Sequence, residues 1–396
     1  MAGRASLVYL GREDLALTSD PEVTYFIERY TGHSQFAFRT DKIQFKTGTI
    51  VFGQDSLLMI PKYGDLITNM YLKIPSWPAL EALVLDSAGT LMINYAELYI
   101  GNKLIERLYG EYIELKFDLE IPTGKQGALT GLIGKSPPGA SVPVSNPNTN
   151  YTIPLPFSCL KKGLPVCAFD EPLVFRIGFN PTSEFTTPQV AYTQPVTAYL
   201  HIEYTYISDN EVAFIKNKPS LYPIEQIQCQ KFFSPVNVNE LKCILNLVNP
   251  VKEMFFVIQN DNASGYDYST TATTIPTATS TFGTSDQLRQ LTLYFNGTER
   301  ISKDIGTPLF MTTIQSLEFH TRNPTRIFYM YSFSLDPEGD TPAGAVNMSR
   351  INNQILVLFL NPSTSNRYIR VYAKSYNFLL FEKGKLTVQF PNFETS

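Results

Sequence analysis

The clearest strand in this 396-residue sequence is VTAYLHIEYTY, which runs from Val196 to Tyr206. Every second residue is apolar or aromatic, namely Val196, Ala198, Leu200, Ile202, Tyr204 and Tyr206. The residues between them are Thr197, Tyr199, His201, Glu203 and Thr205. Because successive side chains of a strand point to opposite faces, this alternation predicts a half-buried strand of about ten residues.

The same two-residue period recurs on both sides of this stretch. Shorter alternating runs occupy residues 70–74, 173–179, 291–295 and 369–374. Turn-forming pairs lie between the strands, namely Gly101-Asn102, Asn180-Pro181, Asn296-Gly297 and Asn361-Pro362. Many short strands, such turns and little helix predict an all-β chain built from antiparallel sandwiches.

Only two segments carry a helical period. Apolar residues from 103 to 119 recur every three or four positions, and acidic residues lie between them. This pattern predicts a helix over 103–119, inserted between strands. A weaker pattern of the same kind runs from Thr307 to Phe319.

Three short segments of the first half are echoed in the second half, in the same order. The echoed pairs are 98–102 with 293–297, 70–74 with 254–258, and 179–183 with 360–364. Related offsets indicate two similar sandwiches in tandem. The alternative is that β-sandwiches in general share such short patterns.

The domain organisation follows from the repeat. Residues 1–22 are predicted to form an N-terminal arm, 23–210 the first sandwich, 211–221 a linker and 222–396 the second sandwich. Two further stretches are predicted as long loops. They are 134–156, which is rich in proline, and 260–287, which is rich in Ser, Thr, Ala and Gly.

Composition excludes several classes of protein. Only 17% of the residues are charged and the net charge is −4, so no general basic surface for nucleic acid exists. The start lacks the apolar core of a signal peptide, and no apolar run is long enough for a membrane span. Four cysteines, at 159, 167, 229 and 243, fit neither a disulfide scaffold nor a zinc pattern. The 51 aromatic residues (23 Tyr, 27 Phe and one Trp) instead favour a chain that hides surface against other proteins.

Partial motifs for ligand binding are present but incomplete. Gly134-Lys135-Ser136 lacks the earlier glycine of a phosphate-binding loop, because Leu129 stands there. The segment from Asp261 to Asp267 resembles a calcium loop but has Ala263 and Gly265 at ligand positions. Both are better interpreted as ordinary loops.

No catalytic constellation emerges either. The carboxylates Glu106, Glu111, Glu114 and Asp118 share one predicted helix, so we interpret them as its polar face rather than as an acid/base pair across a cleft. The histidines, His33, His201 and His320, lie beside apolar neighbours and are expected to be packed or at the surface. We therefore predict no enzyme, no catalytic, cofactor-binding or metal-binding residue, and no cofactor.

Several segments resemble the double jelly-roll major capsid proteins of nucleocytoplasmic large DNA viruses. The similar segments are Tyr25–His33, Ile60–Ile67, Leu108–Glu114, His320–Pro324, Pro337-Glu338, Thr341–Gly344 and Asn347–Asn352. They occur in order between residues 23 and 375, so the resemblance covers most of the chain.

The resemblance implies two eight-stranded jelly rolls, a homotrimer that forms a pseudo-hexameric capsomer, and an icosahedral shell. It also implies neighbouring capsomers, minor capsid proteins and penton proteins as partners, and a virion assembled in the host cytoplasm. The block Asp336–Arg350 is rich in turn formers. We interpret it as a loop that holds its own jelly roll in shape, with a direct subunit contact as the alternative.

Two other functions stay open at this point. A carbohydrate-binding or carbohydrate-cleaving β-sandwich would use exposed tyrosines and the single tryptophan, Trp77. A minor capsid component of the same architecture would share the fold but differ in its place in the shell.

Overall fold

The computed structural model describes residues 11, 12, 19, 32–78, 82–136, 144–269 and 286–390. Almost all of the arm predicted over 1–22 lies outside these residues, as do the middle of the loop predicted over 260–287 and part of that over 134–156. Residues Ala37–Ser396 form one compact unit, which contains both sandwiches.

The first half of the chain folds into a five-stranded sheet and a four-stranded sheet that face each other. One sheet has the order β1 (Phe36–Ile50), β12 (Val196–Ile207), β3 (Leu66–Ile74) and β8 (Tyr151–Pro154), with β9 (Leu164–Pro165) also paired to β3. The other has the order β2 (Asp55–Ile60), β10 (Leu173–Phe179), β5 (Ile93–Ile100) and β6 (Lys103–Tyr109). A small third sheet joins β11 (Thr186–Thr187), β4 (Leu83–Leu85) and β7 (Val144–Ser145).

The second half repeats this plan. One sheet has the order β13 (Ser220–Ser234), β21 (Arg367–Glu382), β15 (Pro250–Asn260) and β18 (Tyr329–Ser332). The short strands β19 (Val346–Asn347) and β22 (Lys385–Val388) pair with β15 and β21. The other sheet has the order β14 (Glu240–Leu245), β20 (Gln354–Leu360), β16 (Leu288–Phe295) and β17 (Thr298–Ile301).

Strand order identifies both halves as jelly rolls. Numbered along each half without the short extra strands, the eight strands form one sheet in the order 1-8-3-6 and another in the order 2-7-4-5. The three sequence echoes fall at matching places, namely in the third strand, at the turn after the fourth strand and at the end of the seventh. The predicted tandem of related sandwiches is therefore confirmed, and so is the half-buried strand over 196–206.

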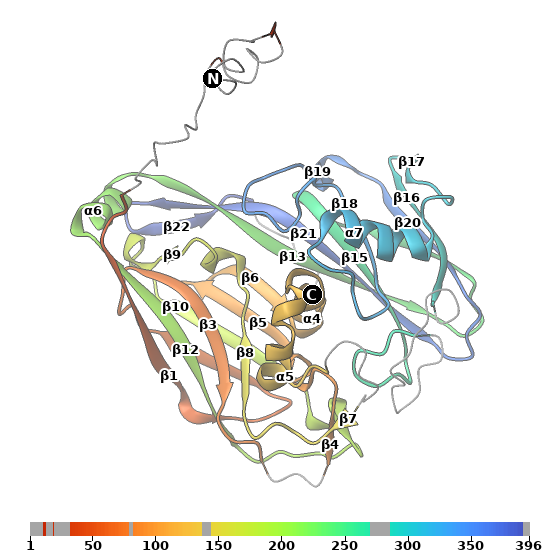
Figure 1. The fold of residues 1–396 in the computed structure, drawn as a ribbon, viewed down its shortest axis with the longest axis horizontal. Helices are drawn as coiled ribbons and strands as arrows, with labels where there is room; N and C mark the ends of the chain where they lie inside the picture. Colours follow the sequence, from red (N-terminus) through yellow and green to blue (C-terminus); the bar gives the residue numbers. More distant parts are fainter. Residues whose placement is uncertain are drawn as a thin grey trace, which may run out of the picture. The chain divides into compact units, whose positions relative to one another are not determined.

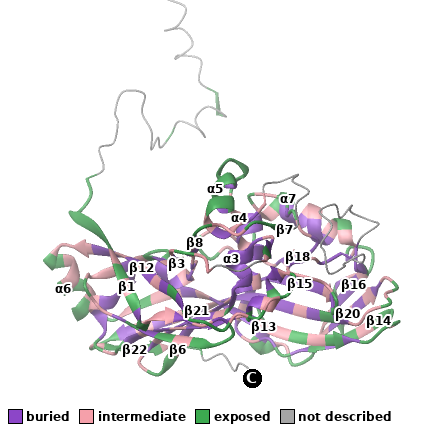
Figure 2. Cartoon of the chain, turned by 90° about the horizontal axis from the view of Figure 1, so that it is seen from below, coloured by how far each residue is buried: buried purple, intermediate pink, exposed green. Residues whose placement is uncertain are grey.

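The two jelly rolls lie side by side and share buried surface (Figure 1). Strand β15 is buried along nearly its whole length, which explains its unbroken apolar run MFFVI. Its residues Met254, Phe256 and Ile258 belong to the core of the second jelly roll. The residues between them, Phe255 and Val257, belong instead to the apolar cluster of the first jelly roll. One sheet of the second jelly roll therefore packs on both faces, and buried residues are continuous across the junction (Figure 2).

The helix predicted over 103–119 is only partly correct. Residues Lys103–Tyr109 form strand β6, and helix α4 begins at Gly110 and ends at Glu120. The hairpin turn at Gly101-Asn102 returns the chain antiparallel to β5, so the ladder extends through Tyr109 before the helix can start. The weaker pattern over Thr307–Phe319 is confirmed, since a π-helical turn, η5 (Leu309–Ile314), leads into α7 (Gln315–Phe319).

Two other segments differ from expectation. Strand β8 lies inside the stretch predicted as a loop over 134–156. The sequence pattern missed this strand because it has only four residues, too few to show a two-residue period. Most of the predicted linker forms helix α6 (Asp209–Asn217). The Ser208 backbone N–H donates to the Glu211 carboxylate at the start of α6.

No helix of the described part is long and apolar enough to cross a membrane.

Candidate functional site: the junction between the jelly rolls

Helix α4 carries three of the four acidic residues that the sequence singled out, namely Glu111, Glu114 and Asp118, and it lies at the junction of the two jelly rolls. Glu114 and Asp118 are fully buried, and apolar residues such as Ile113 and Phe117 are buried beside them. The interpretation as a solvated polar face is therefore wrong for α4. Five of the eleven residues of α4 are charged, so its burial depends on partners from other segments that the sequence pattern does not show. Glu106 lies on β6 instead, where its carboxylate accepts hydrogen bonds from Ser158 and from the Cys159 backbone N–H.

Glu111 anchors the first of three charged groups along α4. Its carboxylate receives two hydrogen bonds from the Arg370 guanidinium, at 2.5 and 2.6 Å, and Arg370 belongs to β21 of the second jelly roll. The hydroxyls of Tyr372 and Tyr268 also donate to it, at 2.6 and 2.9 Å. The bidentate, charge-assisted pair of Arg370 and Glu111 is among the stronger kinds of side-chain contact.

Glu114 and Asp118 form the second group, which holds three cations. Lys135 lies 2.5 Å from Glu114 and 3.0 Å from Asp118. Arg326 pairs with Glu114 at 3.1 Å, and Arg322 pairs with Asp118. Burial by itself raises the pKa of both carboxyls, but these positive charges outweigh burial and hold both pKa values below their ordinary range. Lys135, from the incomplete phosphate-loop motif, is thus an internal ion-pair partner.

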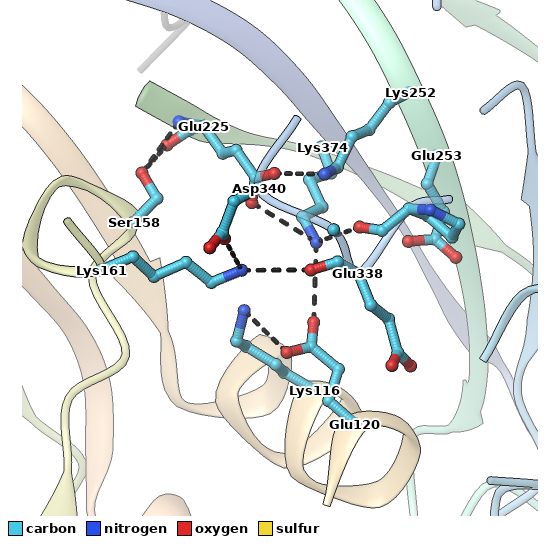
Figure 3. A network of polar contacts seen from close by, with 12 residues as sticks. Lys116, Glu120, Ser158, Lys161, Glu225, Lys252, Glu253, Glu338, Asp340 and Lys374 are labelled. Carbon is cyan, nitrogen blue, oxygen red and sulfur yellow. Dashed lines mark hydrogen bonds and ion pairs between the residues drawn. The ribbon is translucent and has the colours of Figure 1, made fainter. Parts of the chain in front are cut away.

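The third group lies at the end of α4, around Lys374 (Figure 3). The Lys374 ammonium lies 3.5 Å from Glu120 and 3.4 Å from Glu225, and it donates to the Pro337 carbonyl at 2.9 Å. Glu225 also pairs with Lys252. Burial opposes the charge of Glu120, but Lys116 and Lys374 lower its pKa to about 2. Burial and the neighbouring Lys374 lower the pKa of Lys252 to about 8.

His320 is packed, as expected, and it also forms ion pairs with two carboxylates, which the sequence did not reveal. Its Nε2 lies 2.5 Å from Glu253 and its Nδ1 lies 2.9 Å from Glu338. Burial alone would lower the pKa of His320, but the two carboxylates raise it to about 9. The imidazolium therefore ties β15 to the loop that follows β18.

The turn-rich block Asp336–Arg350 holds its own jelly roll, as predicted, and also contacts the first one. Within its own half, the Ser349 hydroxyl accepts from the Asn249 backbone N–H at 2.8 Å. Across the junction, Lys161 lies 3.1 Å from the Asp340 carboxylate and donates to the Glu338 carbonyl at 3.2 Å. A contact of this block with another subunit stays a prediction.

The remaining sequence candidates lie apart from the junction or have structural partners. Asp261 accepts from Asn366, and Asp267 accepts from Ser269. His201 lies on the outer face of β12 and His33 is exposed near the start of the described chain. All four thiols are unpaired. Within the described ranges, no group of three His, Cys, Asp or Glu residues is placed to hold a metal ion.

Chemically, the junction joins two sheets through matched charges in a water-poor setting. Breaking one member of such a pair leaves an uncompensated buried charge, so the network favours one relative placement of the jelly rolls. Two jelly rolls locked together within one chain define the double jelly-roll class of capsid proteins.

Comparisons with known proteins place the chain within that class. Residues 24–212 match the family described as major capsid protein N-terminus, and residues 211–387 match the large eukaryotic DNA virus major capsid protein family. The chain belongs to the major capsid protein family of large eukaryotic DNA viruses, and it is a structural protein of the virion capsid.

Individual relatives are distant but cover nearly the whole chain. The major capsid protein of Pyramimonas orientalis virus is 26% identical, over 96% of this chain and 97% of its own. That of Phaeocystis pouchetii virus is 25% identical, over 96% and 98%. Among solved structures, a chain of the PBCV-1 virus capsid has a TM-score of 0.78 at 19% identity, over 93% of this chain and 100% of its own.

Proposed function

We propose that three copies of the chain assemble into a pseudo-hexameric capsomer, and that capsomers tile an icosahedral shell. The observation that carries the proposal is the identical strand order of the two jelly rolls. Three chains with two equivalent jelly rolls each supply six similar edges, which suit a hexagonal lattice position. The internal charge network supports this role, since a shell subunit needs a fixed angle between its two halves.

We further propose residues 23–210 and 222–396 as the two jelly rolls, with 211–221 joining them and 1–22 as an arm. The partners would be other copies of the chain, neighbouring capsomers, and minor capsid and penton proteins, without direct nucleic-acid contact. Assembly would take place in the host cytoplasm. The protein would act without catalysis, because the charged groups of the junction pair with one another.

The carbohydrate-binding alternative loses the residue that motivated it. Trp77 packs on the first core, with ring centroids 5.2 Å from Tyr151 and 6.2 Å from Phe52 and Phe185. Trp77 is half-buried, and its contacts with three other rings hold it as part of the core rather than as a free platform for a sugar. A minor capsid role shares the same fold, and the copy number of the chain per particle distinguishes it from the major one.

Light scattering on the purified chain tests the trimer. The expected mass is three times the chain mass of 44.6 kDa, and negative-stain images should show hexagonal outlines. A protein that stays at one chain mass across a hundredfold range of concentration would contradict the proposal.

A further inference from the structure

Glu106 is a buried acid of the junction that has no ion pair within the described part of the chain. Its residue is only 3% exposed. By contrast, Glu111, Glu114, Asp118 and Glu120 each pair with a lysine or an arginine. A carboxylate that is buried without a cation is costly, so such a group tends to keep its proton. At Glu106 a bound proton can therefore take the place of a cation.

The Glu106 side chain takes part in a series of polar contacts that crosses the junction. Both of its carboxyl oxygens lie 2.9 Å from the backbone nitrogen of Ser158, in the short helix η2 (Ser158–Leu160) of the first jelly roll. The Ser158 hydroxyl oxygen lies 3.0 Å from Glu106 Oε2. The same hydroxyl oxygen lies 2.8 Å from both the backbone nitrogen and the carbonyl oxygen of Glu225, on β13 of the second jelly roll (Figure 3).

The number of hydrogens decides which of these contacts exist at the same time. The Ser158 hydroxyl has one hydrogen to donate and two lone pairs with which to accept. The Glu225 N–H occupies one lone pair. If Glu106 is ionised, its oxygen and the Glu225 carbonyl oxygen compete for the single hydroxyl hydrogen. If Glu106 is neutral, it donates to Ser158 and Ser158 donates to the Glu225 carbonyl, so every contact is satisfied.

The titratable groups that face Glu106 are paired or neutral. From α4, Lys116 lowers the pKa of Glu106, but its ammonium pairs with Glu120 at 3.1 Å. From η2, burial and the nearby Glu106 raise the pKa of the Cys159 thiol well above its ordinary value. From β13, burial raises the pKa of the Tyr222 hydroxyl. The thiol and the hydroxyl therefore stay neutral near pH 7.

The other neighbours of Glu106 supply no free charge to it. Opposite Glu106 on β5 is the apolar residue Leu98. The Glu225 carboxylate belongs to the third charged group described above. Lys161, which follows η2, pairs with Asp340. Burial therefore dominates, and it raises the pKa of Glu106 to about 7 in spite of the hydrogen bonds from η2.

We propose that Glu106 is a proton-binding site that stabilises the junction, because its neutral carboxyl, Ser158 and the Glu225 backbone form one chain of hydrogen bonds between the jelly rolls. Ionisation of Glu106 draws the Ser158 hydroxyl hydrogen to the carboxylate and takes this donor away from the Glu225 carbonyl. The two jelly rolls are therefore held together more firmly while the proton is bound. The inference concerns a single chain, so it holds or fails independently of the proposed trimer.

Infrared spectroscopy of the full chain, labelled with carbon-13 at its glutamate carboxyls, tests the protonation directly. A neutral carboxyl absorbs apart from a carboxylate, and its band is expected to disappear with a midpoint near pH 7. Glu106→Gln should lack this band, since glutamine keeps the shape and a hydrogen-bond donor but has no proton to lose. Glu299→Gln changes an exposed glutamate of β17 and should keep the band. An unmodified chain without a neutral glutamate band at pH 6 would overturn the proposal.

Urea unfolding of the unmodified chain and Glu106→Gln measures the effect on stability. The pKa of Glu106 is about 7 in the folded chain and 4.5 as the ordinary value, so the folded state binds the proton more tightly. The stabilisation is fully present below pH 4.5 and is lost as the pH rises through 7. The folded-to-unfolded ratio of Glu106→Gln, divided by that of the unmodified chain, is expected to rise roughly fiftyfold from pH 5 to pH 8. A quotient that does not change with pH would contradict the proposal.

Hydrogen exchange of the peptide that contains Glu225 reports on the contact across the junction. At pH 8 its backbone N–H is expected to exchange faster in the unmodified chain than in Glu106→Gln, because ionisation frees β13 from η2. Ser158→Ala removes the middle of the hydrogen-bond chain, so in that background Glu106→Gln should no longer change the exchange rate. Equal exchange rates in the unmodified chain and Glu106→Gln at pH 8 would overturn the proposal, because Glu106 would then hold a proton without stabilising the junction.

Discussion

The Arg326 guanidinium of the second jelly roll lies 3.1 Å from the Glu114 carboxylate of the first, although 212 residues separate them in the sequence. Arg326 also pairs with Asp86 at 2.6 Å, and its charge helps to hold the pKa of Glu114 low. One side chain thus links two segments of the first jelly roll to the second.

Replacing Arg326 with methionine should strongly destabilise the protein. The change removes the cation that pairs with Asp86 and one of the two cations that pair with Glu114, and loss of one partner from a buried pair costs about 3–5 kcal/mol. Urea unfolding followed by fluorescence measures the effect. The control is Arg39→Met, because Arg39 pairs with Asp41 at the surface with 64% of its side chain exposed, and pairs so exposed to solvent contribute little to stability. Equal midpoints for the two variants would show that the buried pair does not hold the junction.

Stability should fall as the pH rises from 6.5 to 9, because of His320. Its pKa is about 9 in the folded chain and 6.5 as the ordinary value, so the folded state holds the proton more tightly. The stabilisation is fully present below pH 6.5 and is lost as the pH passes through 9.

Thermal unfolding of the wild type and His320→Gln across this range isolates the histidine. Lys252, whose pKa is about 8, works in the opposite direction above that pH in both proteins and cancels in the comparison. The difference between the two proteins is expected to shrink steadily from pH 6.5 to 9.5. A constant difference would mean that His320 does not carry the charge assigned to it.

Gly110 should tolerate no side chain. A Cβ at this position would lie 2.0 Å from the Ile93 carbonyl oxygen and 2.4 Å from that of Thr90, so α4 would have to move. Gly110→Ala is expected to lower the free energy of unfolding by about 1–3 kcal/mol or more. Gly127→Ala is the matched control in α5 (Gly127–Ile133), because nothing lies within 4 Å of its Cβ. Differential scanning calorimetry should show a lower transition for the first variant only.

Residues 222–396 alone should aggregate. Without the first jelly roll, Phe255, Val257 and Tyr372 would be exposed on one flat sheet. Size-exclusion chromatography and binding of a hydrophobic dye measure the outcome. The rescue variant Phe255→Lys with Val257→Thr should shift the fragment toward a monodisperse species. A soluble, monodisperse unmodified fragment would contradict the importance of this face.

Much of the fold was predictable because its signals are local. Alternation within 196–206 and the turns at Gly101-Asn102 and Asn296-Gly297 depend on a few neighbouring residues. The helix over 103–119 was placed too early for the same reason. Apolar spacing at 104, 105 and 108 fits a helical period, and only the pairing with β5, which has an irregularity between Leu98 and Tyr99, makes the segment a strand.

The sequence by itself determined the strands, the tandem repeat and the family resemblance, since periodicity and short motifs survive without knowledge of the partner strands. Only the tertiary structure decided which charges meet. Glu111 and Arg370 are 259 residues apart, and their contact depends on how one jelly roll lies against the other. No local pattern records that placement, because it is set by the stacking of the sheets and by burial of α4 between them.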